Sequence, residues 1–189
     1  EILNLLVNNG FLGYDYEFQK YEAFQNIFSK YFEKQRYLAR YNSEDFVITC
    51  AEGKKHLSYL IDSDSNDSRV IIKLTDQICK KVNKIIFSFI DGEGDSPANM
   101  QKSVSNIEIN WLFKYNYFGM QYIEKYGRDF FENFPCENKE YITEGIIRIN
   151  LVKDIFEEID KNLKEKVREY LDHFSIPIKF YNHNKFLID

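Results

Sequence analysis

The sequence predicts a single α+β domain over residues 1–189, with a mostly antiparallel sheet, helices packed on one face, and helices at the N-terminal end. Three observations lead to this class. Apolar residues recur at helical spacing in several segments, and short β-branched runs lie between them. No stretch rich in Gly, Ser or Pro divides the chain.

The N-terminal segments are predicted to be helical. Residues 1–9 read as a short helix that Gly10 ends. From Glu17 to about Lys34, apolar residues spaced three and four apart predict an amphipathic helix. Its apolar face consists of Phe18, Tyr21, Phe24, Ile27, Phe28, Tyr31 and Phe32.

Strand signals follow. Residues 46–50 and 56–61 are predicted strands, and the polar stretch 62–68 is a predicted loop. Residues 69–74 read as a further strand, which would make a long-looped hairpin. Thr75 is then expected to cap a short helix through Asn83.

The middle of the chain carries the strongest strand signal. Residues 84–90 are almost entirely apolar, which predicts a central strand buried on both faces. A loop is expected from Asp91 to about Asn106, and residues 107–115 alternate as a strand does. Residues 118–134 return to helical spacing until Pro135 stops the helix.

The C-terminal third is predicted to be strand, helix and strand. Residues 145–152 form a strand, and residues 154–174 carry the cleanest helical stripe. Pro177 bars continuation of that helix, and residues 179–188 form an edge strand.

Charge and composition narrow the partner. The chain has 30 acidic and 25 basic residues, a net charge of −5, which argues against nucleic acid and suits docking onto a basic protein. Aromatic residues make up 17%. Codon usage of an AT-rich genome explains this excess more readily than an aromatic contact surface does, although interfaces favour Tyr and Trp.

Compartment and membrane signals point to a cytoplasmic protein. Cys50, Cys79 and Cys136 lie far apart and form no CxxC pair, so buried free thiols are expected rather than a disulfide scaffold. The apolar runs are too short to span a bilayer, and no signal peptide is evident.

The first acidic segment begins like a calcium loop. Asp62, Asp64 and Asn66 occupy the first, third and fifth positions, but Asp67 and Lys73 stand where such a loop needs Gly and Glu. A solvated turn is therefore expected, with Asp62, Asp64 and Asp67 available to a basic partner.

The second acidic segment carries Asp91, Glu93 and Asp95 after a predicted strand. Carboxylates at a strand end can hold a divalent ion. A turn that keeps the strand tip soluble is the favoured interpretation, and a docking surface for a basic partner ranks above a metal site because it needs only charge.

Other chemistry is not indicated. His56, His173 and His183 lack metal-like spacing, and no GxSxG, P-loop or GxGxxG motif occurs. His173 is expected at a helix C-terminus, where the dipole favours a cation. No cofactor is predicted, and the chain is not expected to be an enzyme.

One segment resembles a known family. The string N-Y-F-G-x-x-Y-I-E-K-Y-G-R-D-F-F-x-N-x-P, at Asn116–Pro135, is similar to bacterial immunity proteins of polymorphic toxin systems, in particular immunity protein fifty-two and the type VI immunity group. The resemblance extends from Ile107 to Leu171 and is a packing motif. It implies a protein that blocks a cognate toxin by binding it, with no shared active site.

The leading hypothesis is therefore an immunity-type protein that neutralises a toxin by direct contact, with Asp62, Asp64, Asp67, Asp91, Glu93 and Asp95 facing a basic cleft. A phage or host inhibitor of another defence factor is the first alternative. A divalent-metal enzyme that uses Asp91, Glu93 and Asp95 is the second.

Overall fold

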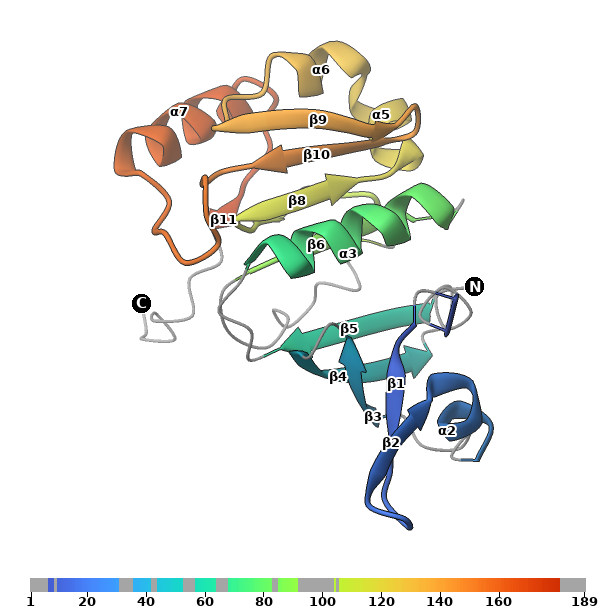
Figure 1. Cartoon of the computed structure of the whole chain (residues 1–189). Helices are drawn as coiled ribbons and strands as arrows, with labels where there is room; N and C mark the ends of the chain where they lie inside the picture. Colours follow the sequence, from blue (N-terminus) through green and yellow to red (C-terminus); the bar gives the residue numbers. More distant parts are fainter. Residues whose placement is uncertain are drawn as a thin grey trace. The chain divides into compact units, whose positions relative to one another are not determined.

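The computed structural model in Figure 1 describes residues 7–8, 10–30, 36–41, 44–52, 57–63, 68–82, 85–91, 104 and 106–180. The chain falls into two compact units, Glu1–Asp67 and Ser68–Asp189, which are described in turn. The α+β class with mostly antiparallel sheets is confirmed. The expectation of a single domain over residues 1–189 stays a prediction.

The first unit is built on a five-stranded antiparallel sheet in the order β2-β1-β3-β4-β5. Its elements are β1 (Leu12–Asp15), β2 (Lys20–Ala23), α2 (Phe24–Lys30), β3 (Arg36–Tyr41), β4 (Glu44–Glu52) and β5 (Leu57–Ser63). Helix α2 packs against β1, where Gly13 leaves room for Ile27: a Cβ on Gly13 would lie 2.6 Å from Cβ of Ile27. Phe11, Phe24 and Ala39 are buried with Ile27.

The predicted helix from Glu17 to Lys34 is wrong in its first part. Residues 20–23 form β2, the helix begins only at Phe24, and residues 31–35 lie outside the described residues. The backbone turns back because the Asp15 carboxylate accepts hydrogen bonds from the backbone N–H groups of Glu17 and Phe18. Of the expected helix at residues 1–9, the structure describes residues 7–8 as helical, and Gly10 has a positive φ of 80°.

The strands expected at 46–50 and 56–61 are confirmed as β4 and β5, although His56 lies outside the described residues. Asp62 was expected in a loop. It belongs instead to β5, where its backbone pairs with Val47, because the ladder with the long strand β4 continues through Ser63.

The second unit contains a four-stranded antiparallel sheet in the order β6-β8-β10-β9, and a two-stranded parallel sheet made of β7 and β11. The strands are β6 (Phe87–Ile90), β7 (Trp111–Leu112), β8 (Tyr115–Phe118), β9 (Asn138–Thr143), β10 (Ile146–Asn150) and β11 (Lys179–Phe180). The helices are α3 (Ser68–Lys81), α5 (Met120–Tyr126), α6 (Arg128–Glu132) and α7 (Lys161–Asp172).

Helices cover both faces of this four-stranded sheet rather than one. Tyr117 and Phe118 are consecutive in β8 and therefore point to opposite faces. Tyr117 bonds to Asp76 of α3, whereas the ring of Phe118 lies 5.2 Å from that of Phe131 in α6. Helix α7 packs on α6, where the Tyr170 hydroxyl donates to the Phe130 carbonyl at 2.7 Å.

The strand predicted at 69–74 is wrong, because residues 68–81 form the helix α3. Its β-branched residues suggested a strand, but Ile71, Leu74 and Ile78 also recur at helical spacing, and burial of that stripe decides the outcome. Thr75 is not a cap. It lies inside the helix and its hydroxyl donates to the Ile71 carbonyl at 2.9 Å.

Two strand predictions in the middle of the chain need correction. The segment 84–90 was expected to be central, but β6 is an edge strand and β8 separates it from β10. In the segment 107–115, Trp111–Leu112 form β7 and Tyr115 begins β8, but the other residues are not in strands, and Ile107 has a φ of 54°. Before β7, backbone groups form hydrogen bonds with tyrosine hydroxyls instead of with a neighbouring strand. The Ile109 N–H donates to the Tyr126 hydroxyl, and the Glu108 carbonyl accepts from the Tyr122 hydroxyl.

The predicted helix over 118–134 is confirmed in large part, but β8 takes Phe118 and Gly127 divides the rest into α5 and α6. Gly127 has φ 87° and ψ 153°, a conformation that side chains rarely adopt. The strand expected at 145–152 is confirmed as β10.

Helix α7 begins later than predicted. It starts at Lys161 rather than at Asp154, because the Asp160 side chain caps it by accepting the Leu163 N–H at 3.0 Å. Ile155 and Ile159 precede the helix but are still buried. The apolar spacing therefore indicated correctly which residues are buried, but not where the helix begins. Of the edge strand expected at 179–188, the structure describes Lys179–Phe180 as β11, and residues 181–188 lie outside the described residues. The strand β9 was not predicted from the sequence.

Candidate functional site

The six acidic residues predicted from the sequence belong to different parts of the chain. Asp62 lies in β5 and Asp91 directly follows β6. The other four, Asp64, Asp67, Glu93 and Asp95, lie outside the described residues. Their role in partner binding stays a prediction. Within the described part of the chain, no group of three His, Cys, Asp or Glu side chains could hold a metal ion.

The second unit carries an acidic surface that the sequence did not single out. Exposed carboxylates gather on α5, α6, the segment before β9 and the turn after it. We call this surface the acidic face, and its carboxylates are those of Glu124, Asp129, Glu132, Glu137 and Glu144. Figure 1 shows α5, α6 and β9 next to one another.

The cations among these residues are directed at backbone carbonyls. Lys125 Nζ donates to the Asn106 carbonyl at 3.1 Å, and Arg128 Nη2 donates to the Glu144 carbonyl at 3.1 Å. Lys139 Nζ bonds to the Phe134 carbonyl at 3.1 Å and also to the carbonyl of Glu132. Carbonyls at a helix end attract cations. The positive charges are thereby held close to the backbone.

Several carboxylates of the acidic face are left without a cation. Glu124, Asp129, Glu137 and Glu144 form no ion pair within the described residues. The acidic face therefore presents a surplus of negative charge to solvent, which attracts a basic partner and raises its encounter rate.

An aromatic side chain lies among these carboxylates. Tyr141 of β9 is 37% exposed, and the Arg128 guanidinium lies 5.5 Å from its ring centroid. Its hydroxyl faces Glu132 Oε1 at 3.5 Å. Partial burial, and then the charge of Glu132, raise the pKa of Tyr141, so the hydroxyl stays a hydrogen-bond donor at neutral pH. Tyrosine and arginine are residues that interfaces favour.

A charged cluster lies on the opposite side of the sheet, beneath α3. Arg148 of β10 is buried and bonds through Nη1 to both oxygens of Asp76, at 2.7 and 2.6 Å. Its Nη2 bonds to Glu140 at 2.6 Å, and Tyr117 donates to Asp76 at 2.9 Å. Burial lowers the pKa of Arg148, but the hydrogen bonds and charge of Asp76 outweigh it and raise that pKa overall. With its charge neutralised by two carboxylates, Arg148 is a packing residue rather than an anion receptor.

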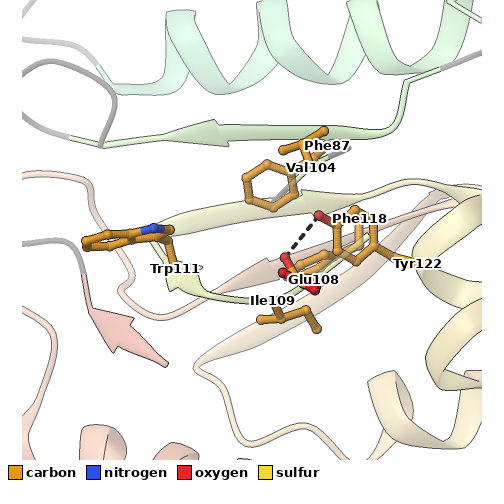
Figure 2. A pocket seen from close by; sticks show the side chains of 7 residues that line it. All are labelled: Phe87, Val104, Glu108, Ile109, Trp111, Phe118 and Tyr122. Carbon is orange, nitrogen blue, oxygen red and sulfur yellow. Dashed lines mark hydrogen bonds between the residues drawn. The ribbon is translucent and has the colours of Figure 1, made fainter. Parts of the chain in front are cut away.

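The small hollow in Figure 2 is too small for a substrate. Phe87, Val104, Glu108, Ile109, Trp111, Phe118 and Tyr122 line a cavity of about 10 Å³, room for one water molecule. The dashed line marks the Tyr122 hydroxyl donating to the Glu108 carbonyl at 3.3 Å. This bond ties α5 to the segment before β7 and is structural.

A wider, more open hollow of about 270 Å³ lies against the parallel strands. Asn110, Trp111, Pro177, Ile178 and Lys179 line it. These side chains include no carboxylate, imidazole or thiol. Lys179 is the ionisable side chain of the lining, and its Nζ lies 5.7 Å from the centroid of the Trp111 ring.

The surroundings of Cys79, Cys136 and His173 indicate structural rather than catalytic roles. Burial, and then the charge of Asp76, raise the pKa of Cys79 to about 12, and burial raises the pKa of Cys136. Neither thiol is activated as a nucleophile. His173 is the C-cap residue of α7, which confirms its predicted position at a helix C-terminus, and its Nδ1 contacts the Glu169 carbonyl. His56, His183 and the side chain of Cys50 lie outside the described residues.

The segment Asn116–Pro135 is a packing motif. Asn116 is fully buried, and its side chain bonds to both the N–H and the carbonyl of Phe113, at 2.9 and 2.7 Å. Gly119 meets the backbone before β6 so closely that a Cβ would lie 2.0 Å from the Ile85 carbonyl oxygen. Asn116 and Gly119 of this segment thus hold β8 in place, and Glu124, Asp129 and Glu132 of the same segment belong to the acidic face.

Comparison of the chain with protein-family models, curated proteins and solved structures gives no match. None of the described helices has the length and apolar character needed to cross a membrane.

The sequence missed the acidic face because it missed β9. The segment Asn138–Thr143 has three polar or charged residues in its first half, which strands disfavour. A usable signal was present. Gly145 opens the predicted strand at 145–152, and a glycine at that position favours a turn, which in the structure joins β9 to β10.

Proposed function

We propose that this chain is an immunity-type protein that neutralises a cognate toxin in the cytoplasm by direct protein–protein contact and without catalysis. The acidic face is the observation that carries the proposal. Its carboxylates outnumber its cations, and those cations are bound to backbone carbonyls. This arrangement suits a partner with a basic surface.

The electrostatic argument also identifies the kind of toxin. Toxins that act on nucleic acid need Lys and Arg to neutralise phosphates. An acidic protein that covers such a basic cleft gains encounter rate from the long-range field and blocks the substrate. The net charge of −5 adds to the local effect. We also propose, from the sequence, that Asp62, Asp64, Asp67, Asp91, Glu93 and Asp95 contact the same toxin.

Co-expression tests the function directly. The toxin encoded beside this gene is induced in cells with and without the protein. We expect growth to be restored by the protein, and a complex of the two to be recovered by affinity purification. Growth arrest that persists at equal expression, with no complex, refutes the proposal.

Charge reversal tests the role of the acidic face. The pair Glu132→Lys and Glu144→Lys changes the charge by the same amount as a control pair on α7, Glu165→Lys and Glu169→Lys. At low salt, we expect the first pair to lower the association rate constant for the inactivated toxin by roughly tenfold or more, and the control pair by about twofold at most. Stopped-flow mixing at two salt concentrations measures both.

Four of the six acidic residues that the sequence singles out are tested in the same assay. Asp64→Lys and Asp67→Lys, and separately Glu93→Lys and Asp95→Lys, are compared with the pairs above. A slower association for either pair places that segment in the interface. Rates equal to those of the control pair remove it from the proposal.

A further inference from the structure

The β1–β2 hairpin of the first unit exposes a group of large apolar side chains. Phe18 in its turn is 62% exposed, Tyr16 is 49% exposed and Leu12 is 40% exposed. Figure 1 shows the turn of this hairpin at one end of the β1–β2 pair, away from the body of its sheet. We call Tyr16 and Phe18 the aromatic tip.

A buried carboxylate supports the backbone of the aromatic tip. Asp15 is 2% exposed, and its Oδ1 accepts the N–H groups of Glu17 at 2.8 Å and of Phe18 at 3.2 Å. Its Oδ2 pairs with Lys30 of α2 at 2.9 Å. Burying a charge is unfavourable unless hydrogen bonds and a counter-charge compensate it. Here these bonds tie the turn that carries Phe18 to α2.

Neighbouring side chains hold the rings themselves. Tyr14 packs edge-on against Tyr16 with 5.2 Å between the ring centroids. Lys30 Nζ lies 4.6 Å from the centroid of the Phe18 ring, and Lys20 Nζ lies 5.5 Å from it. Lys30 also pairs with Glu17 at 2.6 Å, which fixes the lysine over the ring. The aromatic tip is therefore ordered before any partner arrives.

Such preorganisation is the property of a binding anchor. A rigid aromatic side chain contributes a large contact area and loses little conformational entropy on binding. Single exposed apolar residues are common on protein surfaces. The aromatic tip differs, because two exposed rings, two positions apart in the chain, are presented by a turn that the buried Asp15 carboxylate maintains.

The charges around the aromatic tip indicate what it fits. Asp15 and Glu17 balance Lys20 and Lys30 in charge. Further from the turn, Glu22 of β2 accepts a hydrogen bond from Asn26, and Arg40 of β3 lies over the ring of Tyr21. A phosphate backbone or an anionic membrane needs a surplus of cations. A basic cleft needs a surplus of carboxylates, as on the acidic face. A surface that is aromatic and electrically balanced matches a neutral apolar pocket on a protein.

We propose that the aromatic tip inserts Phe18 and Tyr16 into a neutral, apolar pocket of the toxin and supplies most of the lifetime of the complex. The inference rests on the proposed function. Electrostatic surfaces act mainly on association, and buried anchors act mainly on dissociation. The acidic face then governs how fast the complex forms, and the aromatic tip governs how long it lasts.

The test compares two exposed phenylalanines by surface plasmon resonance on the immobilised, inactivated toxin. Phe18→Ala is the variant. Phe156→Ala is the matched control, because Phe156 is exposed and lies in the other unit. We expect Phe18→Ala to raise the dissociation rate constant by on the order of 30-fold, with the association rate constant changed by less than about twofold. The control changes both constants by less than about twofold.

The outcomes separate this inference from the function on which it rests. A wild-type protein that neither binds the toxin nor restores growth refutes the function. A wild-type protein that binds, together with Phe18→Ala and Tyr16→Ala variants that dissociate as slowly, refutes the aromatic tip alone. Equal melting temperatures of variants and wild type show that the fold is unchanged.

A vesicle experiment tests whether the aromatic tip binds a membrane instead of a protein pocket. The wild-type protein is mixed with vesicles of phosphatidylcholine and phosphatidylglycerol at a four-to-one ratio and sedimented. We expect it to stay in the supernatant. Sedimentation that Phe18→Ala abolishes would show that the tip enters a membrane and would overturn the assignment to a protein pocket.

Discussion

The two faces of the four-stranded sheet in the second unit are stabilised by opposite means. On one face, Phe118 and its neighbours pack ring against ring with α5 and α6, at centroid separations of 5.2 to 5.3 Å. On the other face, Arg148 holds Asp76 of α3 and Glu140 of β9 by charged hydrogen bonds of 2.6 to 2.7 Å. Both faces use the same strands, and alternate residues are responsible for the difference.

This difference shows which contacts provide stability and which provide register. Apolar burial is non-directional, so many sequences of similar volume can fill the aromatic face. The ion cluster accepts one geometry, since a shift of one residue along β10 would turn Arg148 away from α3. The aromatic face therefore contributes most of the free energy, and the ionic face specifies how α3 is placed.

The largest expected effect is a truncation on the aromatic face. Phe131 is fully buried and contacts the rings of Phe118, Tyr126 and Phe130. Phe131→Ala is expected to lower the free energy of unfolding by about 3–5 kcal/mol, because it leaves a cavity among close-packed rings. Urea denaturation measures the change. Phe156→Ala, at an exposed position, is the control and should cost about 0.5 kcal/mol or less. Similar losses for the two variants would contradict the comparison.

On the ionic face, the stability lost by removing one charged partner should be regained when the other partner is removed as well. Asp76→Ala is expected to cost about 2–3 kcal/mol, because it leaves Arg148 buried with Glu140 as its remaining carboxylate partner among the described residues. Asp76→Leu combined with Arg148→Met and Tyr117→Phe should return stability to within about 1 kcal/mol of the wild type, since neither a buried charge nor an unpaired hydroxyl remains. A double-mutant cycle by urea denaturation gives the coupling. Additive losses would show that the cluster is not a unit.

High pH should weaken the ionic face through Cys79. Burial, and then Asp76, raise the pKa of this thiol from 9.0 to about 12. As pH rises, the Cys79 thiol ionises in the unfolded chain before it ionises in the folded protein. The free energy of unfolding is therefore unaffected by this thiol below pH 9 and falls as pH rises from 9 toward 12. The free energy of unfolding should fall by about 1.4 kcal/mol per pH unit in this window. Cys79→Ala removes this part of the slope, and an unchanged slope would count against the assignment.

The smallest effect compares one substitution on the two faces. Tyr117 donates to the charged Asp76 at 2.9 Å, and Tyr122 donates to a backbone carbonyl at 3.3 Å. Tyr117→Phe should cost about 1.5 kcal/mol and Tyr122→Phe about 0.5–1 kcal/mol, because bonds to charged groups are stronger. Thermal unfolding of both variants measures the difference. The reverse order would show that the ionic face does not depend on the hydroxyl.

Prediction from the sequence succeeded where one local signal dominated. The strand at 145–152 and the amphipathic character of 118–134 and 154–174 followed from apolar spacing, although the last helix begins only at Lys161. It failed where the same residues suited two structures. Ile71, Leu74 and Ile78 fit a helical stripe, although the β-branched run around them suggested a strand. In the hairpin, the Asp15 side chain stabilised a turn that the spacing of Phe18, Tyr21 and Phe24 concealed.

The candidate sites divide in the same way. The sequence by itself determined the class of the fold, the surplus of negative charge and the packing character of Asn116–Pro135, because these depend on composition and short-range pattern. Only the tertiary structure decided which of the described carboxylates form no ion pair with another described residue. Lys125, Arg128 and Lys139 reach backbone carbonyls up to 19 positions away in the chain. Such contacts arise from folding, and no local pattern encodes them.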